Sequence, residues 1–151
     1  MGEPTPASNS CPGPNSVCPR VVSCKKRIGT SFRTGLVQEV HNDKGPGLIE
    51  SIYEWCLVCE LSLRELATET QSIVPIRSKS FCREEPLRYD VLVNACVLVE
   101  AKSVEKILPI HKAQLLSYMK LLNVPIGLLI NFNVIRLSEG VARLTLPGAD
   151  R

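Results

Sequence analysis

Apolar residues follow a helical spacing in three parts of the chain. From about Arg33 they recur every three or four positions, and the stripe predicted to be buried is Leu36, Val37 and Val40. A Gly-Pro-Gly break at 45–47 precedes a second predicted helix over residues 48–66, and a third is predicted over residues 110–123. The expected core stripe is Ile49, Ile52, Tyr53, Cys56, Cys59 and Leu63 in the second helix, and Leu115, Met119 and Leu122 in the third.

The segments between these helices are rich in β-branched residues and predict strands. Residues 68–76 predict one strand, closed by Pro75, and residues 77–82 a weaker one that ends in a polar turn at 83–86. Residues 126–132 form a continuous apolar run, which is typical of a strand buried on both faces. Residues 134–137 and 141–146 are expected to be short edge strands. The order of elements predicts an α/β sandwich.

The stretch over residues 88–102 predicts a hairpin with a polar turn at Asn94. A three-residue turn over 94–96 places Asp90 opposite Glu100, whereas a two-residue turn separates the two acids. In the first register, Asp90 and Glu100 share one face with Lys102 because side chains alternate along a strand. That face also carries Leu92 and Leu98, and the opposite face carries Val91, Val93, Val97, Val99 and Ala101.

Two carboxylates opposite each other indicate a metal site. Their Cβ atoms would be about 5 Å apart, and a divalent cation between them removes their repulsion. Mg²⁺ prefers oxygen ligands and commonly uses one or two protein carboxylates. Lys102 adds a cation on the same face, where it can orient a water or stabilise phosphate charge. The alternative is an ion-paired sheet face without chemistry, because Glu-x-Lys is common in sheets.

Further candidates lie on the predicted helices. Glu50 occupies the first turn of the second helix, where the helix dipole alone favours an anion; the functional alternative is a third acid beside Asp90 and Glu100. His111, Gln114 and Tyr118 share one face of the third helix, which is either a partly exposed surface or a binding surface. Cys56 and Cys59 are interpreted as small buried hydrophobes in preference to a redox pair.

Composition and charge divide the chain into a tail and one domain. The 151 residues are 44% apolar, enough for one domain with a core. No apolar run reaches the roughly 18–20 residues of a membrane span, and without a signal-peptide pattern a cytoplasmic location and no membrane partner are expected. Residues 1–32 are predicted to be a mobile, basic tail rich in proline and cysteine, 33–147 the domain, and 148–151 a C-terminal tail.

Neither the bulk charge nor the cysteine spacing identifies a function. The net charge of +3 comes mostly from the first 34 residues, so a broad basic surface for nucleic acid is not indicated. Cys11, Cys18 and Cys24 do not have the C-x2-C spacing of a zinc module. An iron–sulfur variant that uses the cysteines is a weaker alternative.

Several motifs in order resemble those of the GxxExxY protein family. The signature is Gly47-Leu48-Ile49-Glu50-Ser51-Ile52-Tyr53. Around it stand Val40-His41, Gly45-Pro46-Gly47, the Asp90 strand, Glu100-Ala101-Lys102, residues 109–118 and residues 127–132. The resemblance covers about residues 34–137. That family is similar to a compact branch of the PD-(D/E)XK nuclease-like superfamily.

The resemblance implies a fold, a site and a reaction. The fold is a PD-(D/E)XK nuclease-like sandwich of α/β class, with a central mixed sheet flanked by helices. The catalytic residues are Glu50, Asp90, Glu100 and Lys102. The metal is Mg²⁺ or Mn²⁺, held by Asp90, Glu100, the backbone carbonyl of Ala101 and Glu50. Gln114 and Tyr118 look like the Q-x-x-x-Y element of RecB-type nucleases, and with His111 they are the expected substrate-binding residues.

The expected function is metal-dependent hydrolysis of phosphodiester bonds in nucleic acid, with DNA favoured over RNA as the partner. The alternative is a catalytically inactive module that keeps the nuclease fold and binds nucleic acid or a protein. A low aromatic content of 5% favours this alternative, because it leaves no obvious platform on which bases could stack.

Overall fold

The computed structural model describes residues 35–147. The predicted tails at 1–32 and 148–151, with Cys11, Cys18 and Cys24, lie outside the described residues.

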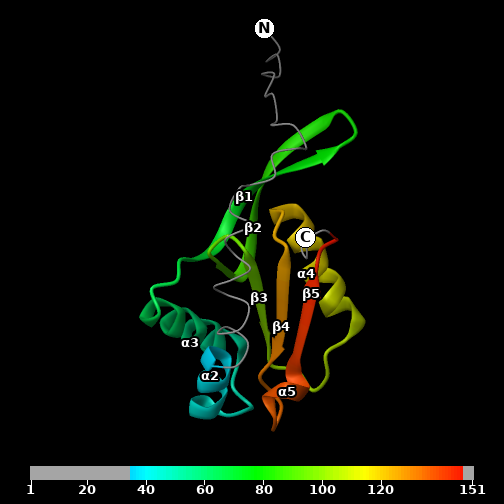
Figure 1. Cartoon of the computed structure of the whole chain (residues 1–151). Helices are drawn as coiled ribbons and strands as arrows, with labels where there is room; N and C mark the ends of the chain where they lie inside the picture. Colours follow the sequence, from blue (N-terminus) through cyan, green and yellow to red (C-terminus); the bar gives the residue numbers. More distant parts are fainter. Residues whose placement is uncertain (1–34, 148–151) are drawn as a thin grey trace, which may run out of the picture.

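Five strands form one mixed sheet with helices on both faces (Figure 1). Along the sheet the order is β1-β2-β3-β4-β5; β3 and β4 are parallel and the other neighbours antiparallel. The elements are α2 (Val37–Lys44), α3 (Glu50–Leu63), β1 (Thr68–Ser78), β2 (Phe81–Val93), β3 (Val97–Lys102), α4 (Pro109–Leu122), β4 (Ile126–Asn131), α5 (Leu137–Gly140) and β5 (Val141–Thr145). The predicted α/β fold with a central mixed sheet is confirmed.

Two apolar cores lie on opposite faces of the sheet. One joins α2 and α3 to the face that carries Val91, Val99 and Ile130; the other joins α4 to Leu98 and Leu129. β4 contributes to both cores, as predicted for a strand buried on both faces. Gly127 lets α4 approach, because a Cβ atom there would collide with the sulfur of Met119. Among residues 35–147, no helix has both the length and the apolar content needed to cross a membrane.

The hairpin has the predicted three-residue turn. Val91 lies opposite Val99 and Val93 opposite Val97. Asn94 fixes the turn: it adopts a positive φ of 49°, its N–H donates to the Ala67 carbonyl at 2.9 Å, and its Oδ1 accepts the Ala67 N–H at 3.0 Å. The predicted separation of faces is confirmed as well. Leu92 and Leu98 pack in the core beside α4, and the other core contains Val91, Val93, Val97, Val99 and Ala101.

The predicted core stripe of α3 is largely wrong. Ile49 and Leu63 are 67% and 78% exposed, and the buried residues are Tyr53, Cys56, Leu57 and Leu61. This helix carries apolar residues on nearly every side, so spacing alone cannot select the side that meets the sheet.

Two strand predictions are also wrong. The polar turn expected at 83–86 lies inside β2, and the chain reverses at Lys79, whose φ is 54°. Here β1 and β2 form a two-stranded ribbon, in which backbone pairing does not require an apolar face. The strand expected at 134–137 is a bend that leads into α5, and His41 Nε2 lies 2.7 Å from the Val134 carbonyl oxygen. The strand expected at 141–146 is confirmed as β5.

Candidate active site

Asp90 lies where β2 separates from β3. The paired positions run from Val93↔Val97 to Val91↔Val99, and beyond them the N–H of Ala101 donates to Asp90 Oδ2 at 2.7 Å. A side-chain oxygen thus accepts a backbone N–H of β3 just past the end of the ladder. This bond fixes the carboxylate of Asp90 beside the strand that carries Glu100 and Lys102.

Glu100 carries the most unusual atom of the site. The residue is 7% exposed, and its Oε1 accepts a hydrogen bond from Lys102 Nζ at 3.1 Å. Its other oxygen, Oε2, is buried and has no hydrogen-bond partner among the described residues. A buried charged oxygen without a partner is costly, because it has lost its water without gaining a donor. This atom therefore points to a positively charged ligand.

The charges of the site are coupled. Burial, reinforced by the negative charge of Glu100, raises the pKa of Asp90 from 3.8 to about 7. Burial by itself would lower the pKa of Lys102. The hydrogen bond that Lys102 donates to Glu100 and the charges of Glu100, Glu50 and Asp90 outweigh burial, so this pKa is raised. Lys102 is therefore a cation at neutral pH, whereas Asp90 is divided between its protonated and ionised forms. A second cation would shift Asp90 to its ionised form.

A cavity of about 360 Å³ opens over Asp90 and Glu100. It is lined by Glu54, Thr70, Gln71, Arg88, Tyr89, Asp90, Glu100, Gln114 and Tyr118. Gln114 and Tyr118, which sequence analysis placed at the substrate, thus face the same space as the two acids. His111 is not part of this lining. Its Nδ1 accepts the N–H of Leu108 at 3.1 Å and so caps the start of α4.

Glu50 lies next to this cluster and has another partner. It is the first residue of α3, and its Oε1 accepts the N–H of Ser103 at 3.2 Å, directly after β3. Ser103 Oγ also donates to the Leu48 carbonyl at 2.5 Å. Among the side chains of residues 35–147, no three carboxylate, imidazole or thiol groups lie close enough together to hold one metal ion. The structure thus joins Asp90, Glu100 and Lys102, and the charge of Glu50 acts on Lys102.

Tyr53 is a supporting residue whose role sequence analysis missed. Its hydroxyl donates to the Gly45 carbonyl at 2.5 Å and accepts the Leu48 N–H at 3.1 Å, and its ring stacks on Phe132 with centroids 4.3 Å apart. These contacts fix the turn before α3 and so the position of Glu50. The available signal was the spacing of the signature, with a tyrosine three residues after the acid.

Asn131 and Glu54 were also missed. Asn131 is 2% exposed; its side chain donates to the Val104 carbonyl at 2.8 Å and accepts the Val104 N–H at 3.1 Å, which holds the segment after Lys102 against β4. Its signal was a polar residue inside an apolar run. Glu54 lines the cavity one helical turn after Glu50, and that spacing of four was its signal.

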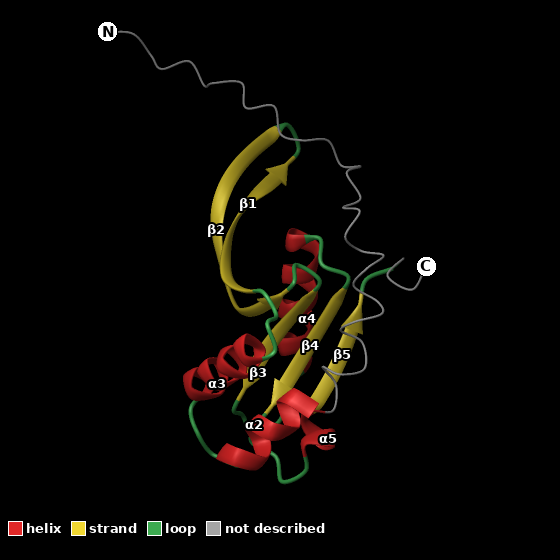
Figure 2. Cartoon of the chain, turned by 60° about the vertical axis from the view of Figure 1, so that its left-hand side comes forward, coloured by secondary structure: helices red, strands yellow, loops and turns green. Residues whose placement is uncertain are grey.

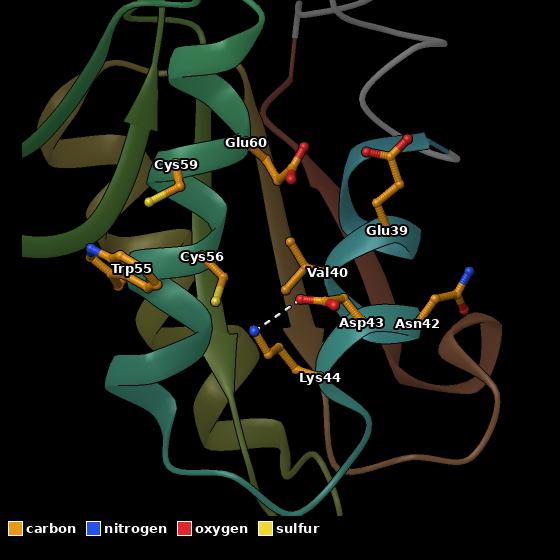
Figure 3. Close-up of a pocket in the computed structure, with 9 residues that line it drawn as sticks. All are labelled: Glu39, Val40, Asn42, Asp43, Lys44, Trp55, Cys56, Cys59 and Glu60. Atoms are coloured by element: carbon orange, nitrogen blue, oxygen red, sulfur yellow. Dashed lines mark ion pairs between the residues drawn. The ribbon is translucent and has the colours of Figure 1, made fainter.

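A larger cavity, of about 550 Å³, lies between α2 and α3 (Figure 3). Its wall includes Lys44, Asp43, Cys56 and Cys59, and the Lys44 ammonium is 2.9 Å from the Asp43 carboxylate. Figure 3 shows Cys56 turned toward Lys44, and Trp55 also lines this cavity. Burial raises the pKa of the Cys56 thiol, which makes it a weak nucleophile. The carboxylate has its partner and the thiol is protonated, so this cavity offers no comparable chemistry.

Comparison with known proteins identifies the family. A family model described as PD-(D/E)XK nuclease superfamily matches residues 30–144. No curated protein and no solved structure matches the chain.

Proposed function

This chain belongs to the PD-(D/E)XK nuclease superfamily, and on that premise we propose that it is a metal-dependent nuclease that hydrolyses phosphodiester bonds in DNA. The observation that carries the proposal is the buried Oε2 of Glu100, which lies beside Asp90 and Lys102 and has no hydrogen-bond partner within residues 35–147. A charged oxygen in this state is consistent with a site built around a cation. Within the superfamily, the motif at 47–53 supports assignment to the GxxExxY protein family.

The residues present fit Mg²⁺ or Mn²⁺. Asp90 and Glu100 offer carboxylate oxygens, and the backbone carbonyl of Ala101 is a further candidate ligand. Two carboxylates suffice for Mg²⁺, which usually keeps several waters, so the lack of a three-acid cluster within 35–147 is compatible with it. A divalent cation bound there supplies positive charge to the scissile phosphate and lowers the pKa of a bound water.

The other residues bind and orient the substrate. Lys102, held by Glu100 at 3.1 Å, neutralises charge that builds up on the phosphate oxygens. Gln114 and Tyr118 contact the nucleic-acid backbone from the wall of the cavity. Glu50 supports the site from the start of α3, as an outer acid that holds water or a second ion. His111 was expected at the substrate, and its bond to Leu108 supports a role in positioning α4.

The proposal is tested by cleavage of labelled single- and double-stranded DNA and RNA with Mg²⁺ or Mn²⁺. We expect wild type to cut DNA only with metal, and Asp90→Asn to lose cleavage. Asp43→Asn is the matched control, since Asp43 lines the other cavity and is paired with Lys44. Metal-independent cleavage, or equal cleavage by wild type and Asp90→Asn, would overturn the proposal.

The second candidate function is a nucleic-acid or protein-binding module without catalysis. It is favoured by the absence of a three-acid cluster among the described side chains. Thermal unfolding separates the two functions, because a ligand that binds only the folded state raises the melting temperature. An active site gives a melting temperature that rises with Mn²⁺ in wild type and not in Asp90→Asn. An inactive one gives no metal-dependent rise in either.

A further inference from the structure

The β1–β2 ribbon extends beyond the helices of the molecule (Figures 1 and 2). Its strands pair from Ser72↔Leu87 to Ser78↔Phe81, whereas β2 pairs with β3 over three residues only. Six residue steps at about 3.3 Å give a projecting length of about 20 Å. The base of the ribbon, at Gln71 and Arg88, forms part of the wall of the candidate active-site cavity. An object that lies along the ribbon as far as its base therefore also reaches the cavity.

The ribbon is the basic part of the described chain. Residues 72–88 hold four basic residues (Arg77, Lys79, Arg83 and Arg88) against Glu84 and Glu85, a net charge of +2. The other residues of 35–147 hold eight basic and eleven acidic side chains, a net charge of −3. The positive charge is thus concentrated on the projecting element, beside an acidic cavity. Such a distribution attracts a polyanion to the ribbon and not to the rest of the domain.

The ribbon also exposes apolar side chains along its length. Phe81 at the tip is 76% exposed, and Ile73, paired with Pro86 near the base, is 71% exposed. Large apolar side chains between basic ones suit contact with bases as well as with phosphates.

We propose that the ribbon enters the major groove of double-stranded DNA and holds the duplex against the cavity. The major groove of B-DNA is about 12 Å wide and admits a two-stranded ribbon, whereas the deep, narrow major groove of A-form RNA does not. Lys79 and Arg83 contact phosphates, and Phe81 contacts base edges. This inference rests on the proposed nuclease function for its biological meaning, and it adds the class of substrate, duplex DNA.

The ion pair between Arg83 and Glu85 does not oppose this role. Its atoms are 2.5 Å apart, and the side chains are 76% and 39% exposed. An exposed pair of this kind is worth little in water, so a phosphate can replace Glu85 as the partner of Arg83.

The test measures binding separately from cleavage. The full chain is titrated in EDTA onto a fluorescent DNA duplex of about 20 base pairs, and the dissociation constant is followed as salt is raised. Each phosphate contact contributes about 0.9 to the slope of log affinity against log salt. We expect Lys79→Gln/Arg83→Gln to reduce the slope by about 1.8 and to weaken binding roughly tenfold. Phe81→Ser weakens binding with the slope unchanged.

The matched control is Lys120→Gln/Arg136→Gln, which removes two exposed basic residues that do not belong to the ribbon. Its slope and affinity are expected to equal those of wild type. Circular dichroism melting verifies that each variant is folded; all the substituted ribbon side chains are exposed.

Three binding results overturn the inference: no duplex binding by wild type, equal losses in ribbon and control variants, or equal affinity for duplex RNA. Sedimentation velocity tests the competing role, in which the ribbon joins two protein chains. If wild type is a dimer that Phe81→Ser dissociates while DNA binding is unchanged, the DNA-binding inference is also overturned. The nuclease proposal fails independently. If the protein binds duplex through the ribbon but does not cleave with Mg²⁺ or Mn²⁺, the ribbon inference stands and the nuclease proposal fails.

Discussion

Two cavities described above differ in how their charges are satisfied. The larger one, between α2 and α3, has Asp43 paired with Lys44 at 2.9 Å. The smaller one has the buried Glu100, one of whose oxygens has no partner among the described residues. Volume alone would select the first cavity as the site. Buried charge without a partner selects the second, and the proposed chemistry belongs there.

The two lysine–carboxylate pairs make this comparison quantitative. The Lys44 and Asp43 side chains are 37% and 71% exposed, whereas those of Lys102 and Glu100 are 15% and 9% exposed. Water screens the first pair, so it contributes at most about 1 kcal/mol. The second pair lies in a region of lower effective dielectric, where charges act more strongly. A substitution in one pair should therefore have consequences that the same substitution in the other lacks.

The largest expected difference is between Lys102→Met and Lys44→Met. Removing a positioned cation from a phosphoryl-transfer site commonly costs about 100- to 1,000-fold in rate, so we expect Lys102→Met to reduce DNA cleavage by that amount. Lys44→Met should cleave within about twofold of wild type, because the Lys44 pair is exposed. Single-turnover cleavage with Mg²⁺ measures both rates.

Stability measurements accompany this comparison, because Lys102→Met leaves the buried Glu100 unpaired. Circular dichroism melting establishes that the variant is folded at the assay temperature. If Lys44→Met and Lys102→Met lose the same fraction of activity, the smaller cavity has no special role in cleavage.

The next largest effect is the dependence of stability on pH without metal. The pKa of Asp90 is raised to about 7 by burial and by Glu100, so folding favours the protonated carboxyl. The resulting stabilisation is fully present below about pH 3.8 and is lost as the pH rises through about 7. A fully buried group would contribute about 4 kcal/mol, and the partial exposure of Asp90 reduces this to roughly 2 kcal/mol.

The measurement is urea unfolding in EDTA between pH 4.5 and 7.5. Asp90→Asn cannot titrate, so the difference between wild type and this variant isolates the contribution of Asp90. We expect the advantage of wild type over Asp90→Asn to shrink as the pH rises. A wild-type advantage that grows with pH would mean that the carboxyl of Asp90 is ionised on folding, the opposite of this account.

Much of the fold and part of the site could be predicted from the sequence. The hairpin at 88–102 has two faces whose apolar content depends on its register, and only the three-residue turn buries all five small apolar residues of one face together. The same constraint brings Asp90 to Glu100. The continuous apolar run at 126–132 could form only a strand buried on both faces, which places it at the middle of the sheet.

The other features depend on contacts between segments far apart in the chain. α3 is apolar nearly all round, so only its packing against the sheet shows that Leu57 is inside and Ile49 outside. The length of β2 depends on its pairing with β1. Residues 83–86 of β2 are polar and lie in the paired ribbon, outside the core. The local sequence pattern does not predict that Glu50 accepts a hydrogen bond from Ser103, or that Tyr53 holds the preceding turn.

The smallest expected effect compares two acids of α3, Glu54 and Glu60. Glu54 lines the smaller cavity and its charge contributes to the raised pKa of Asp90, whereas Glu60 lines the larger cavity. Half of the stabilisation by Asp90 is lost at a characteristic pH. We expect Glu54→Gln to lower this pH by about 0.3, because that is the size expected of one partly screened charge at a distance. Glu60→Gln should leave that pH unchanged.

Both variants have the same change of charge on the same helix, so a general effect of net charge predicts equal shifts. The same unfolding series measures them, and equal shifts would mean that Asp90 responds to the whole protein's charge and not to its own cavity.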